Sequence, residues 1–214
     1  MGDFFSGLAI FGEGAKGFSP ATITRLKEVW QKEYNEWARR RLDGKEYVYV
    51  WADGIYCNAR LDDQKLCLLV IIGVTVDGKK ELVAVHQGVR ESEESWLEVL
   101  RDLKFRGLTA EPKLAICDGA LGFQNAVDKV WGQMKIQRCW VHIRTSNPIE
   151  SMFATVRLRH RSTKGNGSAD ATLAMVFKLC KKAEKNWRRL KGFEKLQLVK
   201  EDKTFVDGIL QIAA

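Results

Sequence analysis

Two aspartates stand where apolar runs of the sequence end, and each is followed by a glycine. Asp53 closes one run, in "VWADGIY", and Asp118 closes another, in "AICDGA". A single Asp-Gly pair is typical of a turn. At the ends of two neighbouring buried strands, however, two carboxylates would lie side by side, and like charges this close need a cation to neutralise them. Hard oxygen ligands of this kind suit Mg²⁺ or Mn²⁺.

A third acid, Glu150, lies in "TSNPIESMFATVR", which opens a helix. Asn147 suits the N-cap and Pro148 the first helical position, so Glu150 falls where a capping-box acid bonds back to the N-cap amide. Alternatively, this helix packs beside the strands of Asp53 and Asp118, and Glu150 completes a set of three acids. Three carboxylates that hold two metal ions about 3.5–4 Å apart can activate a nucleophile and stabilise the leaving oxygen of a phosphodiester.

The net charge of +8 is concentrated after Glu150. Between residues 151 and 192, eleven lysines and arginines face two acids, whereas the rest of the chain is close to neutral. A basic block on helices is the electrostatic footprint of a polyanion partner. The plain alternative is a solvated, lysine-rich surface. We predict DNA contacts from Arg144, Arg157, Arg159, Arg161, Lys164, Lys178, Lys181, Lys182, Lys185, Arg188 and Arg189.

The elements that must position these residues follow from hydropathy patterns and turn residues. Strand patterns cover 47–53, 66–76, 80–88, 113–119 and 135–142, and helix patterns cover about 20–41, 91–107, 123–131, a stretch from 147 on, and about 171–190. Asp77-Gly78 indicates a hairpin between the second and third strands. Hairpin-linked strands followed by strand–helix alternation predict an α/β fold with a mixed sheet, three antiparallel strands and then parallel ones, flanked by helices. This is the order of elements in the ribonuclease-H-like fold.

The composition excludes several other classes of protein. Hydrophobic residues make up 45% and charged residues 29% of the 214 residues, which is typical of a globular protein with one core. The longest apolar run, Leu66 to Val76, is too short to span a bilayer, and no signal sequence opens the chain, so we expect a cytoplasmic protein without a membrane partner. Five cysteines at scattered spacings indicate buried, reduced thiols.

Four segments carry a family resemblance: "YVYVWADGIYCNARL", "LAICDGALGF", "QRCWVH" and "RTSNPIESMFATVRLRHRSTKGNGS". They resemble the bacterial insertion-sequence transposases of the Mutator superfamily, over nearly the whole chain. The resemblance implies a DDE transposase with a ribonuclease-H-like core, whose catalytic and metal-binding acids are Asp53, Asp118 and Glu150 and whose cofactor is Mg²⁺ or Mn²⁺ in a two-metal site. It also implies cleavage of element ends, strand transfer to target DNA, action as a homodimer or larger assembly, and association with the bacterial nucleoid.

Two departures from the family pattern shape the expected domain organisation. Residues 1–44 hold a remnant of the N-terminal helical DNA-binding region, 45–192 the catalytic domain, and 193–214 a tail; a helical block of the family is absent near 142–144, which we interpret as an internal deletion. A catalytically inactive DNA-binding remnant that regulates intact transposase is therefore a second hypothesis, and a plain nuclease a third. Cys139 and His142 form half of a metal motif without a second pair nearby, which favours packing over zinc.

Overall fold

The computed structural model describes residues 19–59, 65–119, 121–132, 134–138, 148–162, 167–203, 205–206 and 209–210. At its centre is a five-stranded sheet in the order β3-β2-β1-β4-β5. The strands are β1 (Tyr49–Asn58), β2 (Lys65–Val74), β3 (Lys80–Gly88), β4 (Leu114–Cys117) and β5 (Lys135–Arg138). β1, β2 and β3 pair antiparallel, whereas β4 pairs parallel with β1 and β5 parallel with β4. The predicted mixed sheet is confirmed, and its strand order is that of the ribonuclease-H-like fold.

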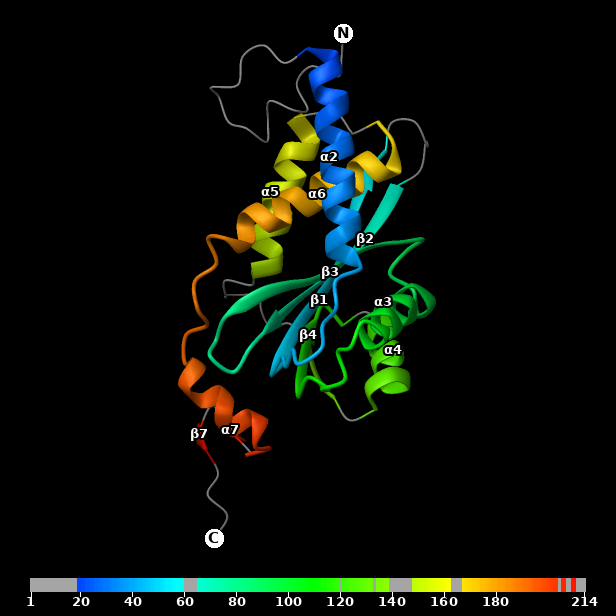
Figure 1. Ribbon diagram of the computed structural model, residues 1–214. Helices are drawn as coiled ribbons and strands as arrows, with labels where there is room; N and C mark the ends of the chain where they lie inside the picture. The colour runs from blue at the N-terminus through cyan, green and yellow to red at the C-terminus, as the bar shows by residue number, and fades with distance from the viewer. Residues whose placement is uncertain are drawn as a thin grey trace.

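Helices cover both faces of this sheet (Figure 1). On one face lie α2 (Pro20–Ala38), α5 (Pro148–Ser162) and α6 (Ala169–Glu184), and on the other lie α3 (Glu93–Phe105) and α4 (Leu121–Trp131). A 3₁₀ turn (Phe193–Lys195), α7 (Leu196–Lys200), β6 (Phe205–Val206) and β7 (Ile209–Leu210) complete the described chain. None of the described helices is both long enough and apolar enough to cross a membrane.

The alternation of side chains along the strands divides the core into two apolar clusters. In β1, Trp51 joins the cluster under α5 and α6, whereas Val50 joins the cluster under α3 and α4. β2 lies between β1 and β3, and every residue from Leu66 to Val74 is buried. Its near-continuous apolar run is therefore that of a strand covered on both faces, as the sequence predicts.

The β2–β3 hairpin turns at the predicted Asp77-Gly78 pair, where Gly78 has a φ of +78° that favours glycine. The same turn explains where the last long helix ends. The prediction of a helix from about Ala171 to Leu190 is wrong at its end, because α6 spans Ala169–Glu184. The Leu190 N–H donates to the Gly78 C=O at 3.0 Å. This hydrogen bond holds the segment after α6 against the hairpin instead of in a continued helix.

Side chains of α2, of the segment that follows it and of α6 bond to the backbone of β3, the strand at the edge of the sheet. The Tyr34 hydroxyl donates to the Val85 C=O at 2.9 Å in a buried contact. The Arg40 guanidinium donates to the Leu82 C=O at 2.9 Å. On the same residue of β3, the Leu82 N–H donates to Glu184 Oε1 at 2.7 Å. Both helices are thus fastened to the sheet by hydrogen bonds as well as by apolar packing.

Candidate functional site

Two of the predicted acids meet where β1 and β4 lie side by side. These strands run parallel with Trp51 opposite Ile116, and Asp118 directly follows the last residue of β4. Asp53 lies two residues beyond Trp51, so both carboxylates come to the same place. The prediction that Asp53 ends its strand is wrong, because β1 stays paired with β2 as far as Asn58, past the end of β4.

A third carboxylate, that of Glu91, joins the two aspartates. One oxygen from each of Asp53, Glu91 and Asp118 lies within 4.8 Å of the others, and we call these three residues the acid group. Asp53 and Glu91 are half-buried, whereas Asp118 is exposed. Carboxylate oxygens this close together can serve as ligands of one divalent cation. The acid group is therefore the candidate metal centre of the described chain.

Two glycines make room for Glu91. The sequence prediction placed this residue in the first turn of a helix, but α3 begins at Glu93 with Ser92 as its N-cap. Glu91 therefore lies in the connection between β3 and α3. A Cβ atom at Gly54 would clash with the Glu91 carboxyl group, and one at Gly122 would lie 2.7 Å from the Glu91 C=O. The only signal for this residue in the sequence is its place shortly after the end of β3, before α3.

The surroundings of the acid group favour a proton or a cation on it. Burial raises the pKa of Asp53 from its ordinary value of 3.8 to about 7. The charges of Asp118 and Glu91 act in the same direction, whereas a 2.8 Å hydrogen bond from the Gly54 N–H and the charge of Arg157 act against it. The pKa of Glu91 is raised too, by burial and then by Asp118. Near neutral pH a divalent cation would therefore compete with a proton for this group.

Glu150 lies in the first turn of α5, as predicted, and its side chain is half-buried. α5 packs on β1, and Ile149 and Phe153 are fully buried in the core beneath it. Among the residues that the structure describes, Glu150 is not part of the acid group. Asn147 lies outside the described residues, and the capping and metal roles of Glu150 both stay predictions.

α5 also brings positive charge to the acid group. The charge of Arg157 acts on Asp53, and its guanidinium lies 5.8 Å from the centre of the Phe153 ring. The exposed members of the predicted DNA-binding set are Arg157, Arg161, Lys182, Lys185, Arg188 and Arg189, and Arg159 is half-buried. Ion pairs join Lys178 to Glu33, Lys181 to Glu184 and Arg189 to Asp77. Arg144, Lys164, Cys139 and His142 lie outside the described residues.

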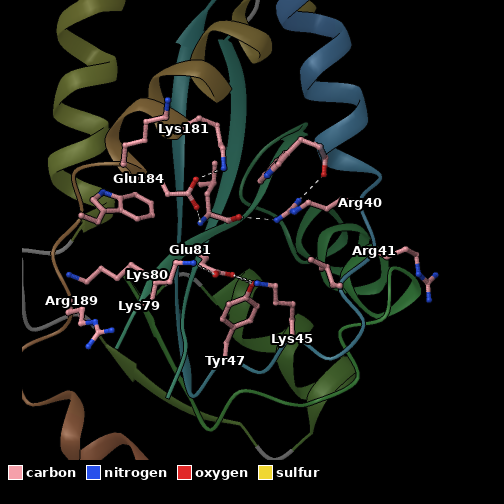
Figure 2. A pocket seen from close by; sticks show the side chains of 15 residues that line it. Arg40, Arg41, Lys45, Tyr47, Lys79, Lys80, Glu81, Lys181, Glu184 and Arg189 are labelled. Atoms are coloured by element: carbon pink, nitrogen blue, oxygen red, sulfur yellow. Dashed lines mark hydrogen bonds and ion pairs between the residues drawn. The ribbon is translucent and has the colours of Figure 1, made fainter. Parts of the chain in front are cut away.

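A cavity of about 700 Å³ lies at the edge of β3, between the end of α2, the start of β3 and the end of α6 (Figure 2). None of its lining residues belongs to the acid group. Eight cationic side chains line it: Arg40, Arg41, Lys45, Lys79, Lys80, Lys181, Lys185 and Arg189. Only two acids, Glu81 and Glu184, do so. We refer to it as the cationic cavity.

Comparison with known proteins shows the family of the chain. The sequence model described as "Transposase, Mutator family" matches residues 10–147 of the 214. The chain belongs to the Mutator family of transposases. The transposase for insertion sequence element IS6120 of Mycolicibacterium smegmatis is 38% identical to this transposase, over 97% of the chain and 87% of the relative. The transposase for element IST2 of Acidithiobacillus ferrooxidans is 35% identical, over 94% of the chain and 93% of the relative.

The alignment of this transposase with its IS6120 relative extends over 283 residues, although the chain has 214. The relative therefore has residues within the aligned span that lack a counterpart here. The family match crosses residue 44, and the division into 1–44, 45–192 and 193–214 stays a prediction. Among solved structures, an intasome of simian T-cell lymphotropic virus with the PP2A regulatory subunit B56 gamma has a TM-score of 0.36 and 14% identity, over 74% of this chain and 58% of that one. A similarity this distant adds nothing to what the sheet topology already shows about the fold.

Proposed function

We propose that this transposase catalyses divalent-metal-dependent cleavage of DNA strands and their transfer to target DNA, and thereby moves an insertion sequence. The observation that carries the proposal is the convergence of Asp53 and Asp118 from adjacent strands. Membership of the Mutator family supports the reaction class. The basic surface of α5 and α6 supports DNA as the substrate.

The acid group is chemically suited to Mg²⁺ or Mn²⁺, because three carboxylates offer hard oxygen ligands within 4.8 Å of one another. Asp53 and Asp118 would hold the ion, and Glu91 or Glu150 would supply a third carboxylate. When bound, such an ion lowers the pKa of a nucleophilic water or hydroxyl and stabilises charge on the leaving oxygen. Asp53, whose pKa is raised to about 7, would release its proton on binding, so metal affinity should rise as the pH passes neutrality.

The basic side chains would hold the DNA strand beside these acids. Arg157 is close enough to act on Asp53, and Arg161, Lys182 and Arg188 are exposed on or just beyond the same two helices. Contacts of this type neutralise phosphates and position the strand without reading its bases. Action as a homodimer or larger assembly on DNA, in the bacterial cytoplasm at the nucleoid, belongs to the same proposal.

A DNA-binding chain without catalysis, which regulates intact transposase by co-assembly, is the second candidate function. Two observations favour it. Glu150 is not a member of the acid group, and a relative has residues inside the aligned span that this chain lacks. The two candidates differ in one measurable property, which is metal-dependent activity on DNA that the chain binds.

Nicking and strand transfer of duplex DNA that carries element ends, with Mg²⁺ or Mn²⁺, tests the proposal. We expect activity that requires the metal and falls at least about 100-fold in Asp118→Asn, because the metal stabilises transition-state charge by several kcal/mol. Asp128→Asn, at an exposed position of α4, is the matched control and should stay active. The variants Glu91→Gln and Glu150→Gln identify the third carboxylate. DNA binding without metal-dependent activity would favour the second candidate, and activity that survives Asp118→Asn would refute the carboxylate site.

A further inference from the structure

The cationic cavity draws its positive charge from three parts of the chain that are distant in sequence. These are the end of α2 with the segment after it, the β2–β3 hairpin, and the end of α6. Figure 2 shows Lys79, Lys80 and Arg189 on one side of Glu81 and Lys45 on the other. The basic surface predicted from the sequence includes only the contribution of α6, so the cavity is a different feature from a charged helix face.

Glu81, at the centre of the cavity, bonds to other side chains that line the cavity. It accepts hydrogen bonds from Lys45 Nζ at 2.9 Å and from the Tyr47 hydroxyl at 3.0 Å, and it pairs with Lys79 at 3.0 Å. Burial acts to raise the pKa of Glu81, but these three donors lower it to about 2. The carboxylate therefore stays ionised and orders the two cations and the tyrosine around it.

Glu184 likewise accepts a hydrogen bond from the Leu82 N–H of β3 and forms an ion pair with Lys181. Lys80 has a different environment. Its ammonium lies over the Trp51 ring, 5.8 Å from the ring centre, and burial lowers its pKa. Lys185 is exposed at the end of α6. An incoming anion stabilises a partly desolvated ammonium such as that of Lys80. Lys185 is accessible because it is exposed. These two lysines are therefore the cations that we expect a ligand to contact.

The position of the cavity favours a polymer of phosphates over a small anion. α5 and α6 pack against each other; Arg157 of α5 acts on Asp53 of the acid group, whereas Lys181 of α6 and Lys185 at its end line the cavity. Duplex DNA carries one negative charge about every 1.7 Å and therefore continues to need cations beyond the reacting phosphate. A cavity of about 700 Å³ can admit a stretch of backbone, and lysines bind its phosphates as point charges.

We propose that the cationic cavity binds backbone phosphates of DNA at a position separate from the acid group, an inference that rests on the proposed DNA substrate. Lys80 of β3 and Lys185 of α6 contact the phosphates, while Glu81 and Glu184 hold the wall in place. The cavity is thus a second anchoring point, which sets the affinity and the path of the DNA. Because its contacts are to phosphates, it is indifferent to base sequence.

Binding of a duplex without element ends, followed by fluorescence anisotropy over a series of salt concentrations, tests this inference. The variant Lys80→Gln/Lys185→Gln removes one cation from each wall. We expect the slope of log affinity against log salt to become shallower by about 1.8, and the affinity near 0.1 M salt to fall by up to about 60-fold. Lys80→Gln alone should change the slope by about 0.9, which separates the cavity from the surface of α6.

The matched control Arg101→Gln/Lys135→Gln removes two exposed cations from α3 and β5 and should bind DNA like the parent protein. A parental slope in the cavity variant, with an unchanged circular dichroism spectrum, would overturn the inference, and so would an equal loss in the control. A nucleoside diphosphate that displaces DNA from the parent at equal phosphate concentration would also overturn it, by assigning the cavity to small anions.

The nicking assay separates this inference from the proposed function. If metal-dependent activity is absent while the cavity variant still weakens DNA binding, the proposed function fails and the cavity retains its role. If nicking proceeds while the cavity variant binds DNA with the parental slope, only the role of the cavity fails.

Discussion

Replacing Asp53 by asparagine should stabilise the metal-free protein, and the gain should grow as the pH rises. Burial raises the pKa of Asp53 from 3.8 to about 7, so between these values the folded state holds a proton that the unfolded state has released. The stability that this group contributes is complete below the unfolded pKa and is lost as the pH rises through the folded pKa. Asparagine does not titrate, so the variant does not lose stability in this way as the pH rises.

The size of the effect follows from the shift in pKa. A rise from 3.8 to about 7, at about 1.4 kcal/mol per unit, sets a ceiling of about 4 kcal/mol. Asp53 is only half-buried, and the Gly54 N–H stabilises its charged form. Solvent screening therefore reduces the difference, and we expect about 1–2 kcal/mol at about pH 8. In urea this is an increase of about 0.5–1 M in the unfolding midpoint.

Urea unfolding followed by tryptophan fluorescence, from about pH 5 to about pH 8, measures this difference. The control Asp128→Asn, at an exposed position, should change the free energy of unfolding by less than about 0.5 kcal/mol throughout. Adding Mn²⁺ at the upper pH should stabilise the parent more than Asp53→Asn, because the ion replaces the missing proton. If Asp53→Asn is less stable than the parent at the upper pH, or if the difference does not depend on pH, the reasoning about this carboxylate is refuted.

Two further substitutions test the supports of the site and of the sheet. Gly54→Ala should displace the Glu91 carboxyl, because the new Cβ would clash with it, and a smaller rise in melting temperature on adding Mn²⁺ is expected; an unchanged rise would contradict this. Arg40→Gln should lower the free energy of unfolding in urea by about 2 kcal/mol, because it removes a charge-assisted hydrogen bond to Leu82. The exposed neighbour Arg39→Gln should cost less than about 0.5 kcal/mol, and equal losses in the two variants would argue against the role of Arg40.

The sheet could be predicted from the sequence because its signals are local. The apolar run of 66–76 specifies a strand covered on both faces, and Asp77-Gly78 specifies the hairpin that follows. Once the strand order is known, the meeting of Asp53 and Asp118 follows from the parallel pairing of β1 with β4. The end of β1 could not be read in the same way, because β2 prolongs the strand beyond the point where β4 stops.

Glu91 and the cationic cavity could not be predicted because they depend on contacts between distant segments. Glu91 reaches the aspartates only because Gly54 and Gly122 lack side chains that would block it. The cavity combines lysines such as Lys80 and Lys185, which are far apart in the sequence. Neither arrangement leaves a periodic pattern in the residues around it. The position of Glu150 depends in turn on the connection between β5 and α5, residues 139–147, which lies outside the described residues.

The hydrogen bonds from α2 and α6 to β3 also restrict how copies of this chain can associate. An open edge strand offers its N–H and C=O groups to a strand of another molecule. Here Tyr34 of α2, Arg40 just after it and Glu184 of α6 already bond to such groups, so a second chain would first have to displace these side chains. Two copies of the chain are thereby prevented from merging their sheets along this part of β3.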